Sequence, residues 1–144
     1  MAKMNPYLNF DGKAEEAFNF YKSVFGGEFT GMHKMSDAPG TENLPDDEKN
    51  RVMHIALPID EHTLLMASDT LPSAGHRLTE GNNVHISLHP TSREEAERLF
   101  NGLSAGGQVE MPLQDTFWGA YFGNFKDKFG INWMVNYAME QPQQ

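Results

Sequence analysis

Two segments of the chain follow one pattern, AEEAFNFYKSVFGG (residues 14–27) and REEAERLFNGLSAGG (residues 93–107). Each has Glu-Glu-Ala near its start, apolar residues at helical spacing and a closing Gly-Gly, and the Glu-Glu-Ala copies lie 79 residues apart. An apolar stripe of this period is typical of a helix that packs on one side. Glycine ends helices because it adopts the left-handed conformation at little cost. The pattern therefore predicts two equivalent amphipathic helices.

Capping residues set the expected starts of these helices. Asp11 is expected to cap a helix over about residues 12–25, because its carboxylate can accept hydrogen bonds from the first free N–H groups. Ser92 and Glu95 have the spacing of a capping box at the head of the second helix.

Runs rich in β-forming residues surround both helices in the same order. They are residues 6–10, 28–34, 52–59 and 62–69 in the first half, and 83–90, 108–111, 117–125 and 130–137 in the second. Leu65-Met66-Ala67 and Trp133-Met134-Val135 lie only 68 residues apart, which fits an extra acidic loop at residues 36–50. The sequence thus predicts an α+β fold of two tandem β-α-β-β-β modules, about residues 4–70 and 82–138, in a single domain over residues 1–144. Two unrelated helices are the alternative, and the shared strand order argues against it.

Composition limits the possible partners. The chain has 144 residues, with Lys plus Arg 11 and Asp plus Glu 20, so its formal net charge is −9. Such a surface repels phosphates, so neither nucleic acid nor a membrane is an expected partner. Cysteine is absent, which excludes disulfides and thiolate metal sites. The N-terminal MAKMNPYLNF lacks the apolar stretch of a signal peptide, so a cytoplasmic location is expected.

The longer motifs resemble a known superfamily. They are PYLNFDGKAEEAFNFYKSVFGGEF (residues 6–29) and MPLQDTFWGAYFGNFKDKFGINWMVN (residues 111–136). They are similar to the vicinal oxygen chelate superfamily of glyoxalase I, ring-cleaving dioxygenases and bleomycin-resistance proteins, and within it to the PhnB-like branch. The resemblance implies a glyoxalase/bleomycin-resistance-like fold, in which two curved mixed sheets surround a cleft and the helices lie outside. It also implies a homodimer.

Strand alternation separates an apolar face from a mixed face in each predicted strand. The apolar face includes Ile55, Leu57, Leu65, Ala67, Trp133 and Val135, and also Met53 and Val84. The mixed face supplies the candidate ligand-binding residues, with Trp118 nearby: His54, Met66, Ser68, His85, Ser87, Asn132, Met134 and Asn136. The alternative is that the mixed faces are solvated sheet surface.

The resemblance also implies where a metal would bind. The ligand positions of the superfamily's metalloenzymes map to Pro6, Met66, His85 and Met134. Only His85 has a side chain suited to Zn, Ni, Mn or Fe. We therefore expect no metal and no other cofactor. If a divalent metal does bind, His54 and His85 are the expected ligands. The histidines assigned to surface turns or loops are His33, His62 and His76.

The sequence favours a small-molecule-binding protein of PhnB-like type, with no reaction and no catalytic residues assigned. The alternative is a metal-dependent lyase, isomerase or dioxygenase of glyoxalase type with a non-standard metal site. A third possibility is a non-catalytic interaction module. A ubiquinone-pathway methyltransferase label is often attached to this branch, but no strand–glycine loop–helix unit is present to hold a methyl donor.

Overall fold

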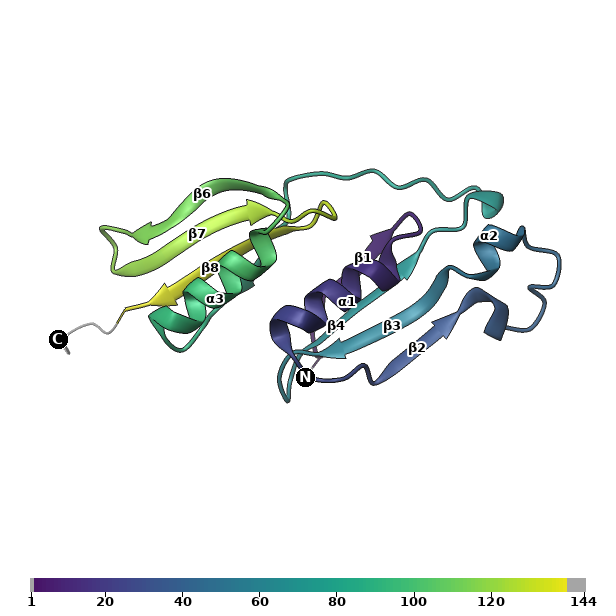
Figure 1. The fold of residues 1–144 in the computed structure, drawn as a ribbon, viewed down its shortest axis with the longest axis horizontal. Helices are drawn as coiled ribbons and strands as arrows, with labels where there is room; N and C mark the ends of the chain where they lie inside the picture. The colour runs from purple at the N-terminus through teal and green to yellow at the C-terminus, as the bar shows by residue number, and fades with distance from the viewer. Residues whose placement is uncertain (1, 140–144) are drawn as a thin grey trace. The chain divides into compact units, whose positions relative to one another are not determined.

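A computed structural model describes residues 2–139, which divide between Thr79 and Glu80 into two compact units (Figure 1). We call them module 1 and module 2. Module 1 contains β1 (Tyr7–Phe10), α1 (Ala14–Phe25), β2 (Gly31–Lys34), η1 (Met35–Asp37), α2 (Asp46–Lys49), β3 (Val52–Pro58), β4 (Leu64–Asp69) and η2 (Pro72–Ala74). Module 2 contains β5 (Ile86–Leu88), α3 (Arg93–Ser104), β6 (Gln108–Asp115), β7 (Ala120–Lys126) and β8 (Asn132–Ala138). The predicted α+β fold of two tandem modules is confirmed.

Both modules have the same mixed sheet topology. The strand order is β1-β4-β3-β2 in module 1 and β5-β8-β7-β6 in module 2. In each sheet the first strand runs parallel to the last one, and the remaining pairs are antiparallel. The parallel pair requires a crossover connection, which the long helix supplies.

The repeat predicted from the sequence is present in the element boundaries. The helices α1 and α3 begin at Ala14 and Arg93 and end at Phe25 and Ser104, a shift of 79 residues at both ends. The strands β3 and β7 are shifted by 68 residues at both ends, from 52–58 to 120–126. The shorter shift arises between β2 and β3, where the acidic loop carries η1 and α2.

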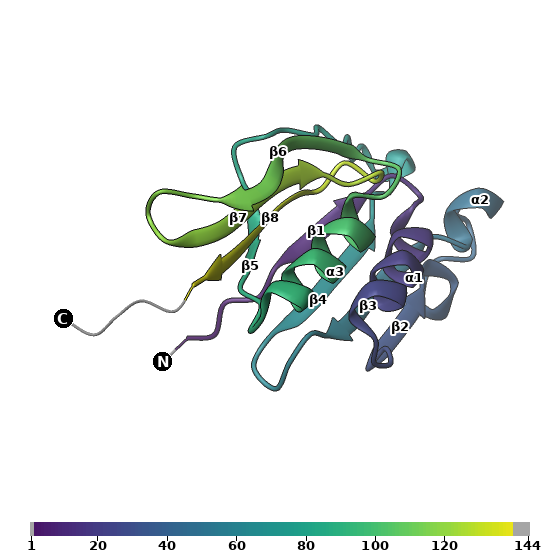
Figure 2. The ribbon, with the colours of Figure 1, turned by 60° about the vertical axis from the view of Figure 1, so that its left-hand side comes forward.

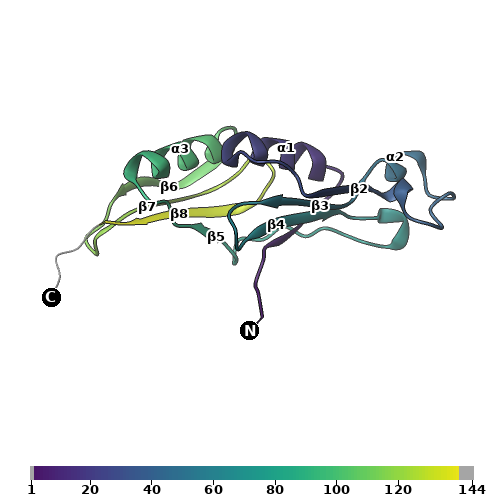
Figure 3. The same cartoon turned by 90° about the horizontal axis from the view of Figure 1, so that it is seen from below.

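Each long helix packs on one face of its own sheet (Figures 2 and 3). In module 1 the buried core comes from α1 and the sheet residues that face it, including Phe18, Tyr21, Ile55, Leu57, Leu65 and Ala67. In module 2 it includes Leu99, Phe100, Leu103, Phe125, Trp133 and Val135. Gly123 of β7 permits this close packing, because a Cβ at that position would lie 2.7 Å from the Phe100 ring.

Two predictions about the apolar faces need correction. Val84 was expected in the core, but 72% of its surface is exposed, because β5 begins only at Ile86. Met53 is half-buried instead of fully buried. The remaining inward-facing residues named from β3, β4 and β8 are buried as predicted.

The start of α1 is held differently from the prediction. Lys13 occupies the N-cap position and makes no side-chain capping bond, and Asp11 does not cap the helix. Asp69, at the end of β4, accepts hydrogen bonds from the backbone N–H groups of Gly12 and Ala14 at 2.9 and 3.0 Å. Its second oxygen accepts from Val52 N at 2.9 Å. A residue 55 positions away in the sequence therefore caps this helix.

The start of α3 follows the prediction. Ser92 is the N-cap residue, and its Oγ accepts a hydrogen bond from Glu95 N at 3.0 Å. The Glu95 carboxylate reaches back to Thr91 N at 2.8 Å. The chain leaves α1 through Gly26, whose φ of 82° lies in the left-handed region expected from the Gly-Gly pair.

The substitution Asp69→Asn tests this distant cap. An amide places an N–H group among three backbone donors, so we expect a loss of about 2–4 kcal/mol in the free energy of unfolding, measured in urea. The control is Asp46→Asn, because the Asp46 side chain is fully exposed; its effect should stay below about 0.5 kcal/mol. Equal stability of the two variants would contradict the role given to Asp69.

Candidate functional site

The sheet face of module 1 that lies away from α1 carries polar and thioether side chains, and we call it open face 1. The register places its members opposite one another. Met66 pairs with Tyr7 on β1 and with Ala56 on β3. Ser68 pairs with Asn9. Open face 1 consists of Tyr7, Asn9, His33, His54, Met66 and Ser68.

Two polar contacts order open face 1. Tyr7 Oη lies 3.3 Å from His54 Nδ1, and the two rings are 5.9 Å apart at an interplanar angle of 31°. Because β4 lies between β1 and β3, the tyrosine ring must extend across β4 to reach His54. Ser68 Oγ donates to Asn9 Oδ1 at 3.4 Å. These contacts fix side chains that remain at least partly exposed.

The corresponding face of module 2, open face 2, is richer in amides. Met134 pairs with Ser87 on β5 and with Asn124 on β7, so it occupies the same register position as Met66 does in module 1. Asn136 pairs with Phe122. Open face 2 consists of Ser87, Phe122, Asn124, Asn132, Met134 and Asn136.

The amide oxygens of open face 2 are poorly satisfied. Within residues 2–139, the Oδ1 atoms of Asn124, Asn132 and Asn136 are buried and have no hydrogen-bond partner. Asn132 nevertheless has a structural role, because its Nδ2 donates to Gly81 O at 2.9 Å and to Val84 O at 3.3 Å. Asn124 and Asn136 thus keep acceptor capacity that the fold does not use, and buried acceptors of this kind call for a physical explanation.

Three other candidate residues lie beside open face 2. His85 lies immediately before β5 and is half-buried. His89 follows β5, and its Nε2 is 3.1 Å from Ser87 Oγ. Trp118 lies in the turn between β6 and β7, where its ring is 6.2 Å from that of Phe122 and 5.0 Å from that of Phe117.

The predicted site residues therefore lie where strand alternation put them, within their own modules. His54, Met66 and Ser68 share open face 1, and Ser87, Met134 and Asn136 share open face 2. A common ligand site for them stays a prediction. Sequence reasoning missed Tyr7, Asn9 and Asn124, although the alternation that selected Met66 and Met134 also selects their partners once the register is known.

His33 is a clear correction. It was assigned to a turn or loop, but it lies on β2, directly opposite His54 in the antiparallel pair with β3. The strand was hard to recognise because it is short, contains Gly31 and has an irregular register after His33.

Comparison with known proteins assigns the family. The model of the glyoxalase/bleomycin resistance protein/dioxygenase superfamily matches residues 3–135. The chain belongs to this superfamily. Protein YjdN from Escherichia coli strain K12 is 31% identical over 151 residues, which cover 98% of this chain and 99% of YjdN.

Solved structures of superfamily members agree with this assignment. Protein PA1353 from Pseudomonas aeruginosa is 41% identical, with a TM-score of 0.85 and coverage of 97% of this chain and 100% of that one. The PhnB protein from Bacillus cereus is 26% identical, with a TM-score of 0.76 and coverage of 95% and 100%. The resemblance to PhnB-like proteins is thereby confirmed.

Many members of this superfamily use divalent metals, so the donor atoms must be compared with that requirement. No group of three or more His, Cys, Asp or Glu side chains comes together among the described residues. The inner strands β3, β4, β7 and β8 contain a single carboxylate, Asp69, which is buried among backbone donors on the side of α1. The thioethers Met66 and Met134 are poor ligands for hard cations. The donors on each open face therefore do not fit a hard divalent metal.

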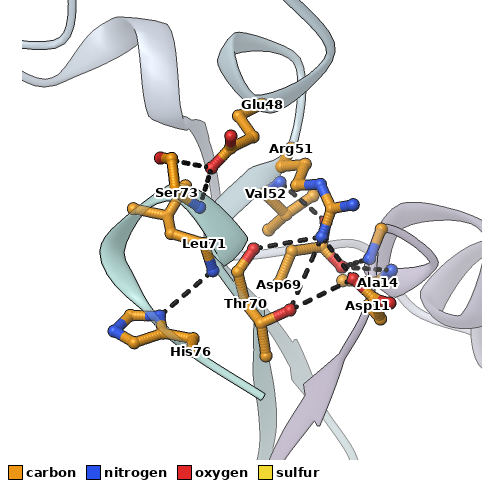
Figure 4. Close-up of polar contacts among 11 residues, drawn as sticks. Asp11, Ala14, Glu48, Arg51, Val52, Asp69, Thr70, Leu71, Ser73 and His76 are labelled. Carbon is orange, nitrogen blue, oxygen red and sulfur yellow. Dashed lines mark hydrogen bonds and ion pairs between the residues drawn. The ribbon is translucent and has the colours of Figure 1, made fainter. Parts of the chain in front are cut away.

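The polar cluster at the end of β4 has a structural role (Figure 4). Arg51 Nη1 contacts Asp11 Oδ1 at 2.7 Å and Thr70 O at 3.1 Å. The buried Glu48 accepts from Ser73 N and Oγ, which ties α2 to η2. These bonds join loops to strand ends and leave no converging groups for a ligand. They also give the acidic loop an anchor that its sequence did not suggest; its mobility stays a prediction.

The ion pair of this cluster predicts a pH dependence. Arg51 lowers the pKa of Asp11 through its hydrogen bond and its charge. A carboxyl pKa that is lowered in the folded state stabilises the protein above the ordinary carboxyl pKa, and that stability is lost as pH falls through the lowered value. We expect wild type to exceed Asp11→Asn in free energy of unfolding at about pH 6, with the difference closing toward about pH 2. The exposed Glu61→Gln is the control, and a difference that persists at low pH would refute the assignment.

Proposed function

We propose that this protein binds a small organic molecule on the open faces of its sheets, with no reaction assigned. One observation carries the proposal. In both modules the helix-covered face is apolar and sealed, whereas the opposite face presents uncharged His, Ser, Asn, Tyr and Met side chains along its inner strands. A sheet face that needed only to be soluble would show charged residues, which this chain has in excess on its other surfaces.

The side chains indicate the chemistry of the ligand. Met66 and Met134 occupy equivalent positions, and methionine adapts its shape to irregular apolar groups. Tyr7 and Phe122 add aromatic surface next to them. Asn124 and Asn136 supply amide oxygens that can accept hydrogen bonds. The acidic surface disfavours anions. The best match is a neutral or cationic molecule with an apolar body and N–H or O–H donors.

A metal-dependent enzyme of glyoxalase type is the alternative, and the donor set argues against it. A structural relative, the fosfomycin resistance protein FosX from Listeria monocytogenes, was solved with Mn(II), but at 12% identity it shares only the fold. Hard metals such as Mn²⁺ prefer carboxylate and water oxygens. Replacement of such donors by Met66 and Met134 fits ligand binding better than Lewis-acid chemistry.

A methyltransferase function is also disfavoured. The B. cereus PhnB relative carries a 3-demethylubiquinone-9 3-methyltransferase description. In this chain the β1–α1 connection has one glycine, Gly12, and the N-terminus of α1 is filled by the Asp69 carboxylate. That negative charge excludes a phosphate or carboxylate of a cofactor from the helix end.

Charged substitutions on the open faces test ligand binding. A library of aromatic amines and amides is screened by thermal shift, and the best compound is measured by calorimetry. Met66→Lys and Met134→Lys should each weaken binding at least about tenfold, because a buried ammonium costs more than about 1.4 kcal/mol. Met4→Lys is the control, since Met4 is 93% exposed.

The same experiment distinguishes the alternatives. Unchanged affinity in both open-face variants would refute the assigned faces. Stoichiometric Zn, Ni, Mn or Fe in tag-free protein purified without added metal would favour the enzyme.

We further propose that the chain forms a homodimer through the region around the β6–β7 turn. Four large apolar side chains are exposed there: Val109 (45%), Met111 (38%), Phe117 (98%) and Trp118 (56%). Exposed aromatic and methionine groups of this kind are enriched in interfaces. No helix in the described part of the chain has the length and apolar character of a membrane span. The cytoplasmic location and the absence of a nucleic-acid partner remain predictions from composition.

Trp118→Glu tests this interface. We expect light scattering at micromolar concentration to show a dimer for wild type and a monomer for the variant, because a carboxylate in an apolar interface is strongly unfavourable. Val84→Glu should remain dimeric, since Val84 is equally exposed but lies before β5. A wild-type monomer would contradict the proposal.

A further inference from the structure

The pairing of β2 with β3 brings two histidines together on open face 1. His33 and His54 are directly opposite in the antiparallel register. Opposed residues share a sheet face, and their Cβ atoms lie about 4.5–5.5 Å apart. The next residue, Lys34, points the other way and contacts Glu15 on α1 at 2.8 Å. This contact supports the placement of His33 on the face away from the helix.

Both imidazoles are accessible. His33 is exposed and His54 is half-buried. Across open face 1, two imidazole groups on neighbouring strands can therefore reach one cation from the solvent side. Chelation by two donors that are already held close is stronger than binding by either donor alone, because the second bond forms within the molecule.

Tyr7 orients one of the two donors. Its Oη is 3.3 Å from His54 Nδ1. When Nδ1 carries the proton and donates to Tyr7, Nε2 keeps its lone pair and is free to bind a metal. A hydrogen bond from the second nitrogen is the usual way in which proteins fix the tautomer of a metal-binding histidine.

We propose that His33 and His54 form a binding site for a borderline divalent cation such as Ni²⁺, Cu²⁺ or Zn²⁺, with Tyr7 as the positioning residue. Imidazole pairs favour these ions over Mg²⁺ or Ca²⁺, which need oxygen ligands. The net charge of −9 attracts a cation to the molecule. The site is separate from the positions that the superfamily resemblance implies, because it uses β2 and β3 instead of the first and last strands.

Calorimetry with Ni²⁺ on tag-free, full-length protein tests the site. Wild type should bind one Ni²⁺ per chain and show no heat with Mg²⁺. His33→Gln and His54→Gln should each lower the affinity about tenfold or more. Tyr7→Phe should lower it about tenfold through loss of the second-shell contact, while both histidines remain. Circular dichroism confirms that each variant is folded.

The other histidines supply matched controls. His62→Gln and His76→Gln should bind Ni²⁺ as wild type does, because both residues lie in turns away from open face 1. Loss of binding in His85→Gln with retention in His33→Gln would overturn the proposal in favour of a site shared by His54 and His85. Absence of Ni²⁺ binding to wild type at millimolar concentration would overturn it outright.

Discussion

Module 1 depends on one buried carboxylate. Asp69 stands at the end of β4 and accepts three backbone N–H groups, two at the start of α1 and one at the start of β3. The charge of this group is balanced by oriented backbone dipoles, so its burial is tolerated. Because the same two oxygens hold three elements, the position of α1 over the sheet and the register of the sheet are fixed together. Open face 1 is therefore presented by a rigid support.

Module 2 reaches the same topology with different polar contacts. Ser92 caps α3 locally, so no distant carboxylate is required there. Asp127 instead organises the turn before β8: it accepts from Phe129 N and Ile131 N, and its second oxygen accepts from the buried Trp133 Nε1 at 2.8 Å. The repeat thus preserves the apolar pattern and strand order, while the buried hydrogen bonds have diverged. This divergence explains why the two open faces carry different side chains on one backbone plan.

Much of the fold was predictable because the signals were local. Helical spacing, Gly-Gly termini and the Ser92 cap each act within a few residues, and they located both helices and the repeat. The Asp69 cap was not predictable, because it joins residues 55 positions apart that only the folded sheet brings together. The same limitation applies to the site. Alternation selected Met66 and Met134, whereas the His33–His54 pair depends on a cross-strand register that a short irregular strand does not reveal.

The outer strand β6 has a consequence for assembly. It lies at the edge of its sheet, contains Pro112, and changes register between Val109 and Met111 and again before Gln114. Proline removes a backbone donor and irregular register interrupts the ladder, so a further strand cannot pair regularly along this edge. The aromatic side chains of the adjoining turn can therefore be exposed without turning the sheet into a template for fibril growth. Association at this surface is restricted to side-chain packing, which favours closed assemblies of defined size.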